Sequence, residues 1–411
     1  MALPGVSVQI QDRFYALSRT NAPAGPRVCA IAKRTTDDNT GGVRDLDAYE
    51  ATTESDVITA FGENSNLHKA FVEIIAGGAQ KVILVALPSD TVFSHSTAAV
   101  TSSSFGGSVF EAAFEAAEAA QVDIIVPWGS GSNSDHWESP ATPGNDGSFD
   151  YFYADNSSSA STSWAKLVSD MCATITNRSA PVHAVMGIKP YIGVANADGS
   201  MTAASLSTHL GLSNLVDRES LTNGHYLSVV AAELRVVGVP STWGFSNGAA
   251  LYAGSVMRLN PWSATTGKVV YNSDRIRWNP TRTQAEALSN SGVVPVTLDL
   301  NRVARWTDGT TFGKDGSDYE RLTTLRITFD AVKVVRSISQ NYVGEATTIA
   351  NRNAFETQLT SALRGMQILG ALISSDFRVT YVPTENKAIV DLALRPAFEL
   401  REVVVRVAVN F

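Results

Sequence analysis

Short apolar strands that alternate with amphipathic helices restrict the fold of this chain more than any other feature. Residues 81–87 (Lys-Val-Ile-Leu-Val-Ala-Leu) and 122–126 (Val-Asp-Ile-Ile-Val) are apolar runs, each followed by a proline, as is typical of strands buried on both faces. An Ala-rich stretch between them, 109–120, predicts a helix. Since parallel strands need crossover connections, this order predicts an α/β (α+β) fold with a mostly parallel or mixed sheet.

The strand and helix periodicities of the apolar residues predict further elements. Helices are expected at 54–61, 66–75, 163–176, 222–238, 247–258 and 353–372, and strands at 28–32, 181–188, 293–298, 304–306, 377–381 and 388–394. Gly77 and Gly78 are expected to end the 66–75 helix, and Asn353 and Glu356 have capping-box spacing at the start of the 353–372 helix. Small residues, among them Ala253 and Gly254, predict that the 247–258 helix packs closely on its neighbour.

Both ends of the chain carry a strand pattern that needs a partner. Near the C-terminus, Val403, Val405, Val407 and Val409 fall on one face of an extended segment, and near the N-terminus Val6, Val8 and Ile10 do the same. An apolar edge strand that stays unpaired is an aggregation hazard. Each segment is therefore expected either to complete the sheet of its own subunit or to be donated to a neighbouring copy.

Composition limits the classes of function. The 411 residues carry a net charge of -8, which argues against nucleic acid as the main partner. Residues 321–411 hold 11 basic and 8 acidic side chains, so this part is suited to an acidic partner. Cys29 and Cys172 are far apart and are expected to be buried thiols. With no signal peptide and no long apolar run, the protein is expected to be made in the cytosol and not to insert into a membrane.

The sequence carries no recognisable catalytic constellation. The loop Gly129 to Asn133 follows a predicted strand, as ligand loops do in α/β proteins, but it matches neither a dinucleotide-binding nor a nucleophile-elbow pattern. None of the six histidines has metal-ligand spacing. We therefore expect no metal, no cofactor and no enzymatic activity, and we expect an interaction protein. The alternative is a cytosolic α/β enzyme or ligand-binding protein that uses the Gly129 to Asn133 loop.

An ordered set of segments resembles the tail sheath proteins of contractile phage tails and of R-type pyocins. At the N-terminal side the segments are Pro4-Gly-Val-Ser-Val-Gln and the helix, Gly-Gly-Ala turn and strand of residues 71–85. Val239-Pro240 followed by Ala249 to Gly254 is similar to a Val-Pro and Ala-Gly segment of the family. At the C-terminal side the segments are Gly370-Ala-Leu, Asp376-Phe-Arg-Val, residues 388–394 and residues 395–405. Phe398 departs from the family pattern, and residues 90–235 resemble no sheath segment.

This resemblance implies an architecture with exchanged terminal strands. Residues 1–20 would be an N-terminal arm, 21–260 an outer α/β domain with a variable middle part at about 90–235, 261–400 an inner domain, and 401–411 a C-terminal arm strand. The inner domain would be formed by the C-terminal part together with the N-terminal arm. Val6, Val8, Ile10, Val403, Val405, Val407 and Val409 would lie in the strands exchanged between subunits.

The resemblance also implies a structural role. Copies of the chain would polymerise around an inner tube and contract to drive it through a target cell envelope, as in genome ejection by a bacteriophage. Arg352 and Arg364 are candidates for facing the tube. The partners would be further copies, the tail tube protein, and baseplate and tail terminator proteins, in a virion tail assembled in the host cytoplasm. The hinges are expected at 19–26 and at an Arg395-Pro396 turn, where the chain can bend.

Overall fold

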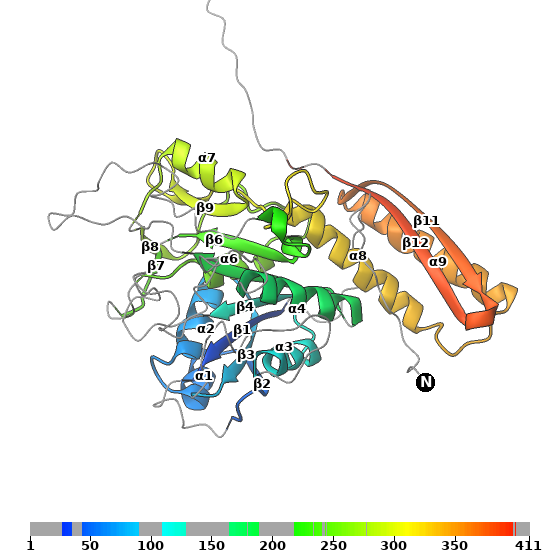
Figure 1. The fold of residues 1–411 in the computed structure, drawn as a ribbon, viewed down its shortest axis with the longest axis horizontal. Coiled ribbons are helices and arrows are strands. Elements are labelled where there is room, and N and C mark those ends of the chain that lie inside the picture. The colour runs from blue at the N-terminus through cyan, green and yellow to red at the C-terminus, as the bar shows by residue number, and fades with distance from the viewer. Residues whose placement is uncertain are drawn as a thin grey trace, which may run out of the picture.

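The protein consists of a body and a lobe that projects from one side of it (Figure 1). The computed structural model describes residues 27–34, 43–89, 109–128, 164–178, 180–188, 218–232, 234–240, 243, 245–276, 278–397 and 399. The lobe consists of residues 341–397. A long helix, α8 (Leu322–Gln340), leads from the body into it.

A sheet of eight strands forms the centre of the body in the described part of the chain, in the order β10-β9-β6-β5-β4-β1-β3-β2. The strands are β1 (Arg27–Lys33), β2 (Ala48–Ala51), β3 (Lys81–Leu87), β4 (Ile124–Trp128), β5 (His183–Ile188), β6 (Leu227–Ala231), β9 (Val293–Leu298) and β10 (Ala304–Trp306). The six inner strands are parallel, and β2 and β10 pair antiparallel at the two edges. The mixed α/β sheet expected from the sequence is confirmed.

Helices cover both faces of this sheet. They are α1 (Glu54–Phe61), α2 (Asn66–Gly77), α3 (Val109–Ala119), α4 (Trp164–Arg178), α6 (Ala249–Arg258) and α7 (Arg282–Asn290). The chain passes from β1 through α2 to β3, then returns through α3 to β4 on the other side of β1. Right-handed crossovers in opposite directions place α2 and α3 on opposite faces. Since α6 packs beside α2 and α4 beside α3, the inner strands are buried on both faces.

Two glycines set the distance between α2 and α6. A Cβ atom on Gly77 would lie 2.3 Å from the carbonyl oxygen of Leu251, and one on Gly254 would lie 2.2 Å from that of Ile74. Only hydrogen fits at these positions, so the helices cross backbone to backbone. The close packing predicted from the small residues of the 247–258 segment is confirmed.

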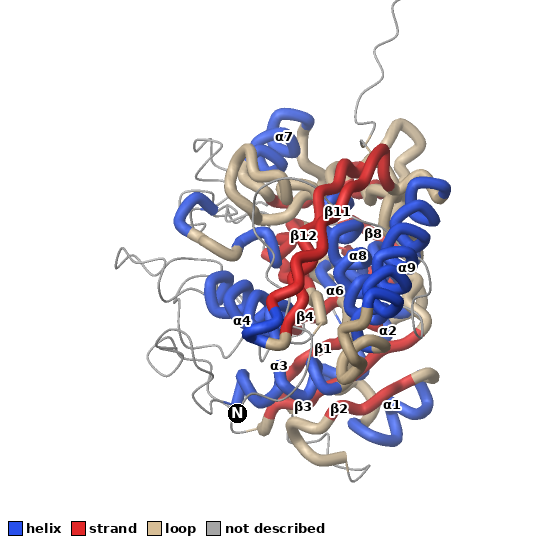
Figure 2. Tube along the Cα trace, turned by 90° about the vertical axis from the view of Figure 1, so that its right-hand side faces the viewer, coloured by secondary structure: helices blue, strands red, loops and turns tan. Residues whose placement is uncertain are grey.

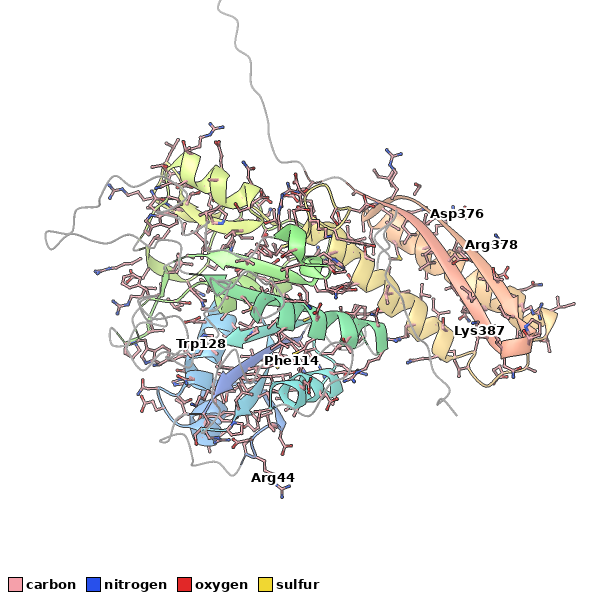
Figure 3. The ribbon with its side chains drawn as sticks, viewed as in Figure 1. Arg44, Phe114, Trp128, Asp376, Arg378 and Lys387 are labelled. Atoms are coloured by element: carbon pink, nitrogen blue, oxygen red, sulfur yellow. The ribbon has the colours of Figure 1, made fainter. Side chains whose placement is uncertain are left out.

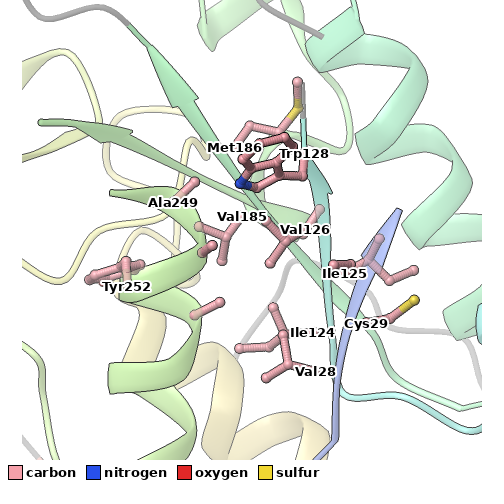
Figure 4. Close-up of a cluster of buried hydrophobic side chains, with 14 of the residues drawn as sticks. Val28, Cys29, Ile124, Ile125, Val126, Trp128, Val185, Met186, Ala249 and Tyr252 are labelled. Carbon is pink, nitrogen blue, oxygen red and sulfur yellow. The ribbon is translucent and has the colours of Figure 1, made fainter. Parts of the chain in front are cut away.

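The main core lies where the sheet meets α6. Figure 4 shows Val28, Ile124, Val126 and Val185 gathered between the sheet and α6, and each is at most 3% exposed. The two cysteine side chains are also completely buried and unpaired with each other, and burial raises the pKa of both thiols far above the usual value. The expectation of buried thiols is confirmed.

A second, smaller core holds the lobe together. The helix α9 (Ile349–Ile368) packs against a hairpin of β11 (Leu372–Val382) and β12 (Lys387–Pro396), and in the turned view of Figure 2 the three lie next to one another. Leu363, Met366, Leu372 and Leu394 form the cluster with Ile327 of α8. The described chain also forms a small second hairpin, of β7 (Leu234–Val236) and β8 (Ser273–Ile276), in the body.

Several predicted elements agree with the structure at both ends. The strand 81–87 and the helix 54–61 have the predicted bounds, and the helix 66–75 extends only to Gly77. Gly78 follows with φ of 109°, a left-handed conformation that glycine adopts without steric cost, as expected for the end of a helix.

The helix predicted at 222–238 is wrong. This segment forms the strands β6 and β7 instead. Leu227, Val229 and Val230 are completely buried within the sheet. A short apolar run that is buried on all sides carries no period that separates strand from helix, and its β-branched residues favour the strand.

Other predicted bounds are wrong as well, and the helix predicted to end at 372 ends at Ile368, because Leu372 begins β11. The lobe helix begins at Ile349 rather than 353, because the Thr348 hydroxyl accepts a hydrogen bond from the amide of Asn351 at 3.2 Å and caps it. Pro127 does not end β4 but lies inside it, opposite Ile31 of β1. The Arg395-Pro396 turn is absent, since both residues pair within β12, opposite Ser374 and Leu372.

The eight-stranded sheet extends beyond the expected domain boundary at residue 260. Strands β9 and β10, at 293–306, pair within it next to β6. The lobe, by contrast, has its own sheet and its own core, and it lies wholly within 261–400. The division at 260 stays a prediction.

Candidate assembly surface

The lobe presents a two-stranded sheet whose outer edges have no partner strand among the described residues. Strands β11 and β12 pair over ten registered positions, from Leu372 opposite Pro396 to Val382 opposite Lys387. A short turn at Pro383–Glu385, followed by Asn386 in the left-handed region, joins them. Isolated two-stranded sheets are marginally stable in water, and open edges are sites at which further strands add.

The two faces of this hairpin differ. Phe377 faces Leu392, Val379 faces Val390, and the cluster that includes Phe377 and Leu392 packs on α9. The opposite face is exposed and carries charged side chains. These include Asp376, Arg378 and Lys387, which Figure 3 labels on the hairpin, and Asp391, which lies opposite Arg378. A strand added at either edge with alternating apolar residues would continue the apolar face over α9.

The outward face of α9 is poor in charge. Its exposed residues are Ile349, Ala350, Asn353, Ala354, Thr357, Gln358, Thr360, Ser361, Arg364 and Ile368. Of these only Arg364 is charged. Since a solvated helix face normally carries many charged side chains, this composition is typical of a face that contacts another protein.

The two arginines expected to face a tube lie in different environments. Arg364 is exposed on α9, whereas the guanidinium of Arg352 lies over the ring of Tyr381 in β11, 4.4 Å from its centroid. The hydroxyl of Tyr381 donates to the carboxylate of Glu356 at 3.5 Å. Arg352 therefore helps to join α9 to the hairpin, and Arg364 is the arginine available to a partner.

Helix α8 ties the lobe to the body. Leu325 and Phe329 belong to the core of the body, while Ile327 and Ala331 belong to the core of the lobe. Arg326 donates hydrogen bonds to the carbonyl oxygens of Leu259 at 2.7 Å and Asn260 at 3.2 Å, at the end of α6. The Lys333 ammonium pairs with the carboxylate of Asp123 at the start of β4. One helix therefore contributes side chains to both cores.

A cavity of about 310 Å³ lies at this junction, lined in part by Asp123, His183, Arg326 and Lys333. His183 is buried and forms a 3.0 Å hydrogen bond with the hydroxyl of Ser228, which donates to the carbonyl oxygen of Thr310. Burial, with Arg326 and His225 nearby, lowers the pKa of His183 to about 3, so its ring is neutral. The ion pair of Lys333 with Asp123 and the Arg326 contacts to carbonyl oxygens lie in the wall of this cavity.

The terminal strand residues lie outside the described residues. These are Val6, Val8, Ile10, Val403, Val405, Val407 and Val409, and the loop Gly129 to Asn133 also lies outside. Within the described ranges, no group of three or more His, Cys, Asp or Glu side chains is arranged to hold a metal ion. No described helix is both long and apolar enough to cross a membrane.

The sequence pattern did not predict a hairpin without a further partner strand in the described chain, nor the exposed isoleucines at the two ends of α9. The strands at 377–381 and 388–394 are each expected from the sequence, but the pattern of a single strand does not show how many strands its sheet has, and in the described chain no third strand joins these two. Ile349 and Ile368 stand on the polar face of a helix, and that departure from amphipathicity was the available signal.

No family model and no curated protein matches the sequence. Solved structures do match it. The chain is similar to a chain of the anti-feeding prophage baseplate, with a TM-score of 0.61 and 11% identity over 100% of both chains. It is similar to a chain of the contracted PVC sheath complex, an extracellular contractile injection system, with a TM-score of 0.60 and 10% identity over 99% of this chain and 98% of that one. The sheath tail protein of Listeria innocua matches with a TM-score of 0.57 and 11% identity, over 92% and 93% of the two chains.

This chain has the fold of contractile sheath proteins. At these identities the similarity is one of fold, and it includes the lobe as well as the body because it covers the chain from end to end. The fold expected from the resemblance at both ends of the sequence is thus confirmed.

Proposed function

We propose that this chain is a subunit of a contractile sheath that polymerises around an inner tube and contracts to drive it through a target cell envelope. The observation that carries the proposal is the end-to-end similarity to sheath proteins, in which body and lobe are matched together. The function is structural and needs neither a cofactor nor an active site. No observation favours the alternative, a ligand site at Gly129 to Asn133.

Terminal strands hold the polymer together. The open edges of the hairpin accept strands, and the segments with Val6, Val8 and Ile10 and with Val403 to Val409 have the alternation that such edges require. Each ladder hydrogen bond contributes roughly 1 kcal/mol, and each buried valine about 1.5 to 3 kcal/mol. A pair of exchanged strands per subunit therefore withstands a large rearrangement of the lattice.

Contraction moves the body and lobe as one rigid unit. The support is that α8 contributes to both cores and is fixed by Arg326 and Lys333 at the junction. In this proposal the chain bends during contraction only in the segments outside 27–397, including the predicted hinge at 19–26. The energy is stored when the extended lattice assembles, so no nucleotide is consumed.

The helix α9 faces the tube, with Arg364 as the contact to an acidic surface. Its outward face is nearly uncharged apart from this residue, as expected for a surface covered in the assembly. Further partners are baseplate and tail terminator proteins. The chain works in a virion tail or a phage-like injection device, assembled in the host cytoplasm, without direct binding of nucleic acid or insertion into a membrane.

Electron microscopy of the purified full-length chain, alone and with its tube protein, tests the proposal. We expect long hollow cylinders whose wall repeats contain the body and lobe described here. Discrete small particles under all assembly conditions would instead favour the enzyme or ligand-binding alternative.

A further inference from the structure

The valine row near the C-terminus fits the edge of a strand in more than one register. Val403, Val405, Val407 and Val409 recur at every second position, so a shift of two residues along a partner strand keeps each valine on the same face. Burial of the valines therefore selects the face but not the register. Because copies in a regular polymer are held in the same way, a second feature of the strand must set the register.

The outward charges of this C-terminal segment have the same spacing as charges on β12. In an extended strand, Glu402 and Arg406 lie on the face opposite the valines and are four residues apart. On β12, Asp391 and Arg395 are also four residues apart, and both are exposed. In an antiparallel register with Arg406 opposite Asp391, Glu402 lies opposite Arg395. Both charges then face an opposite charge, and a shift by two residues in either direction loses both pairs.

The edge of β11 offers no such match. Its charged residues are Asp376 and Arg378, which are only two residues apart. Since Glu402 and Arg406 are four residues apart, at most one of them can lie opposite an opposite charge on β11 in any register. The charge pattern therefore selects the edge of β12.

The direction of the added strand follows from the charges at the hairpin turn. In a parallel strand with Arg406 opposite Asp391, Glu402 would lie opposite Lys387, whose ammonium already pairs with the carboxylate of Glu385. An antiparallel strand places Glu402 at the other end of β12, away from Glu385. Antiparallel pairing is also slightly more stable per residue. The antiparallel direction is therefore favoured.

The other charges near this edge are compatible with the antiparallel register. Within the hairpin Asp391 lies opposite Arg378, so the added strand places Asp391 between Arg378 and Arg406. The two arginines are then two strands apart, about 10 Å, which makes their repulsion weaker than the attraction of each to the carboxylate between them. Arg401, the remaining charge of the segment, lies opposite the uncharged Pro396.

The strand that fills this edge comes from a second copy. Within one subunit the register would require a two-residue turn at 398–399, because the amide of Ala397 still donates to the carbonyl oxygen of Ala371 at 3.0 Å. Two-residue turns need residues that adopt left-handed conformations, mostly Asn, Asp and Gly, whereas Phe398 and Glu399 stand here. The carboxylate of Glu399 instead accepts a hydrogen bond from the hydroxyl of Thr266 in the body.

We infer that Glu402 and Arg406 set the register of the donated C-terminal strand by pairing with Arg395 and Asp391 on β12 of a neighbouring copy. This inference rests on the proposed function, because it requires donation of the strand to another copy. The valines supply the buried apolar area, and the two charged residues supply the specificity of register.

Disulfide cross-linking in assembled cylinders measures the register. Directly opposite residues of antiparallel strands have Cα atoms about 4.5 to 5.5 Å apart, which a disulfide can span, and a shift by two residues exceeds its reach. Since Val404 lies opposite Ala393 in the inferred register, oxidation of the Ala393→Cys/Val404→Cys variant is expected to give a ladder of dimers, trimers and longer chains. Cys29 and Cys172 are completely buried, so the parent should give no ladder.

A matched variant tests the two charges. In the same cysteine background, the exchange Glu402→Arg/Arg406→Glu keeps the composition and every valine, but it places like charges opposite each other in both pairs. Because attraction becomes repulsion at two positions, about tenfold less ladder is expected at low salt. Equal ladders from the two forms would show that these charges do not set the register.

The remaining outcomes separate this inference from the proposed function. Cylinders that form but give no ladder from Ala393→Cys/Val404→Cys overturn the register and leave the sheath proposal standing. A ladder from Ile389→Cys/Val404→Cys instead would mean a parallel strand and also overturn it. A disulfide within single chains would mean that the strand stays in its own subunit, which overturns strand donation on this edge. Absence of any cylinder with the unmodified chain overturns the proposed function together with this inference.

Discussion

At the scale of single residues, several residues with unusual surroundings lie where one element packs against another. Gly254 lets α6 touch α2, Arg352 lies on Tyr381 between α9 and the hairpin, and the neutral ring of His183 is buried at the junction with α8. The small residues of α6 were visible in the sequence. The environments of Arg352 and His183 were not, because each depends on residues distant in sequence.

Replacing Gly254 by alanine should destabilise the protein by about 1–3 kcal/mol, because the new methyl group would meet the carbonyl of Ile74 and force α2 and α6 apart. Denaturant unfolding of the purified protein measures the change. Ser361→Ala, on the exposed face of α9, serves as the control and should stay within about 0.5 kcal/mol of the parent. Equal stability of both variants would contradict the close crossing.

His183 should make the fold sensitive to mild acid. Its pKa is about 3 in the folded protein, below the ordinary value of 6.5, so at lower pH the unfolded chain takes up the proton and the folded chain does not. The stability contribution is present above the unfolded pKa and falls as the pH drops below it. Between about pH 7.5 and pH 5 the parent should lose about 2 kcal/mol more than His183→Gln. Parallel pH profiles of unfolding free energy would rule this out.

Charge reversal at Arg364 should weaken co-assembly with an acidic tube. At low salt the Arg364→Glu variant is expected to need a higher concentration of tube protein than the parent for co-assembly. The difference should shrink at high salt, because salt screens the interaction between exposed charges. Sedimentation of the assembled complex measures it. Arg44→Glu, on the exposed surface of the body away from the lobe (Figure 3), is the matched control and should behave as the parent. Arg352→Glu should instead loosen α9 from the hairpin. If the Arg364→Glu variant co-assembles as the parent does at low salt, Arg364 is not part of the tube contact.

At the scale of elements, periodicity predicted the strands and helices whose two sides differ or whose ends carry clear signals. The strand 81–87 and the helix α2 are examples, since the strand is followed by a proline and the helix ends on glycine. Periodicity failed at β6, because a strand that is buried on all sides shows no alternation of apolar and polar residues. It also failed at the start of α9, where the Thr348 hydroxyl caps the helix instead of Asn353. Sheet order and open edges could not be predicted, because they depend on pairing between distant segments.

The true start of α9 can be tested by removing each candidate cap. Thr348→Ala should cost about 1 kcal/mol of local stability, because the amide of Asn351 loses its acceptor. Asn353→Ala, on the exposed side of the helix interior, should change little. Hydrogen exchange in the first turns of α9 reports both. Faster exchange in Asn353→Ala than in Thr348→Ala would restore the cap expected from the sequence.

At the scale of the whole molecule, a body with a covered sheet carries a lobe whose hairpin pairs with no third strand among the described residues. The outward helix face of the lobe is nearly uncharged, and exposed isoleucines lie at both ends of α9. The resemblance in the terminal segments predicted the sheath fold, and the similarity to solved structures confirms it. The terminal strands themselves stay a prediction, because Val6 to Ile10 and Val403 to Val409 lie outside the described residues.

Removal of residues 403–411 tests strand donation most directly. Without Val403, Val405, Val407 and Val409 the chain has no C-terminal strand to offer, while the body and lobe lose none of their described contacts. The truncated protein should therefore stay soluble and folded, with the circular dichroism and thermal unfolding of the parent, yet form no long cylinders in electron micrographs taken under conditions where the full-length chain does. Long cylinders from the truncated protein would contradict donation of this strand to a neighbouring subunit.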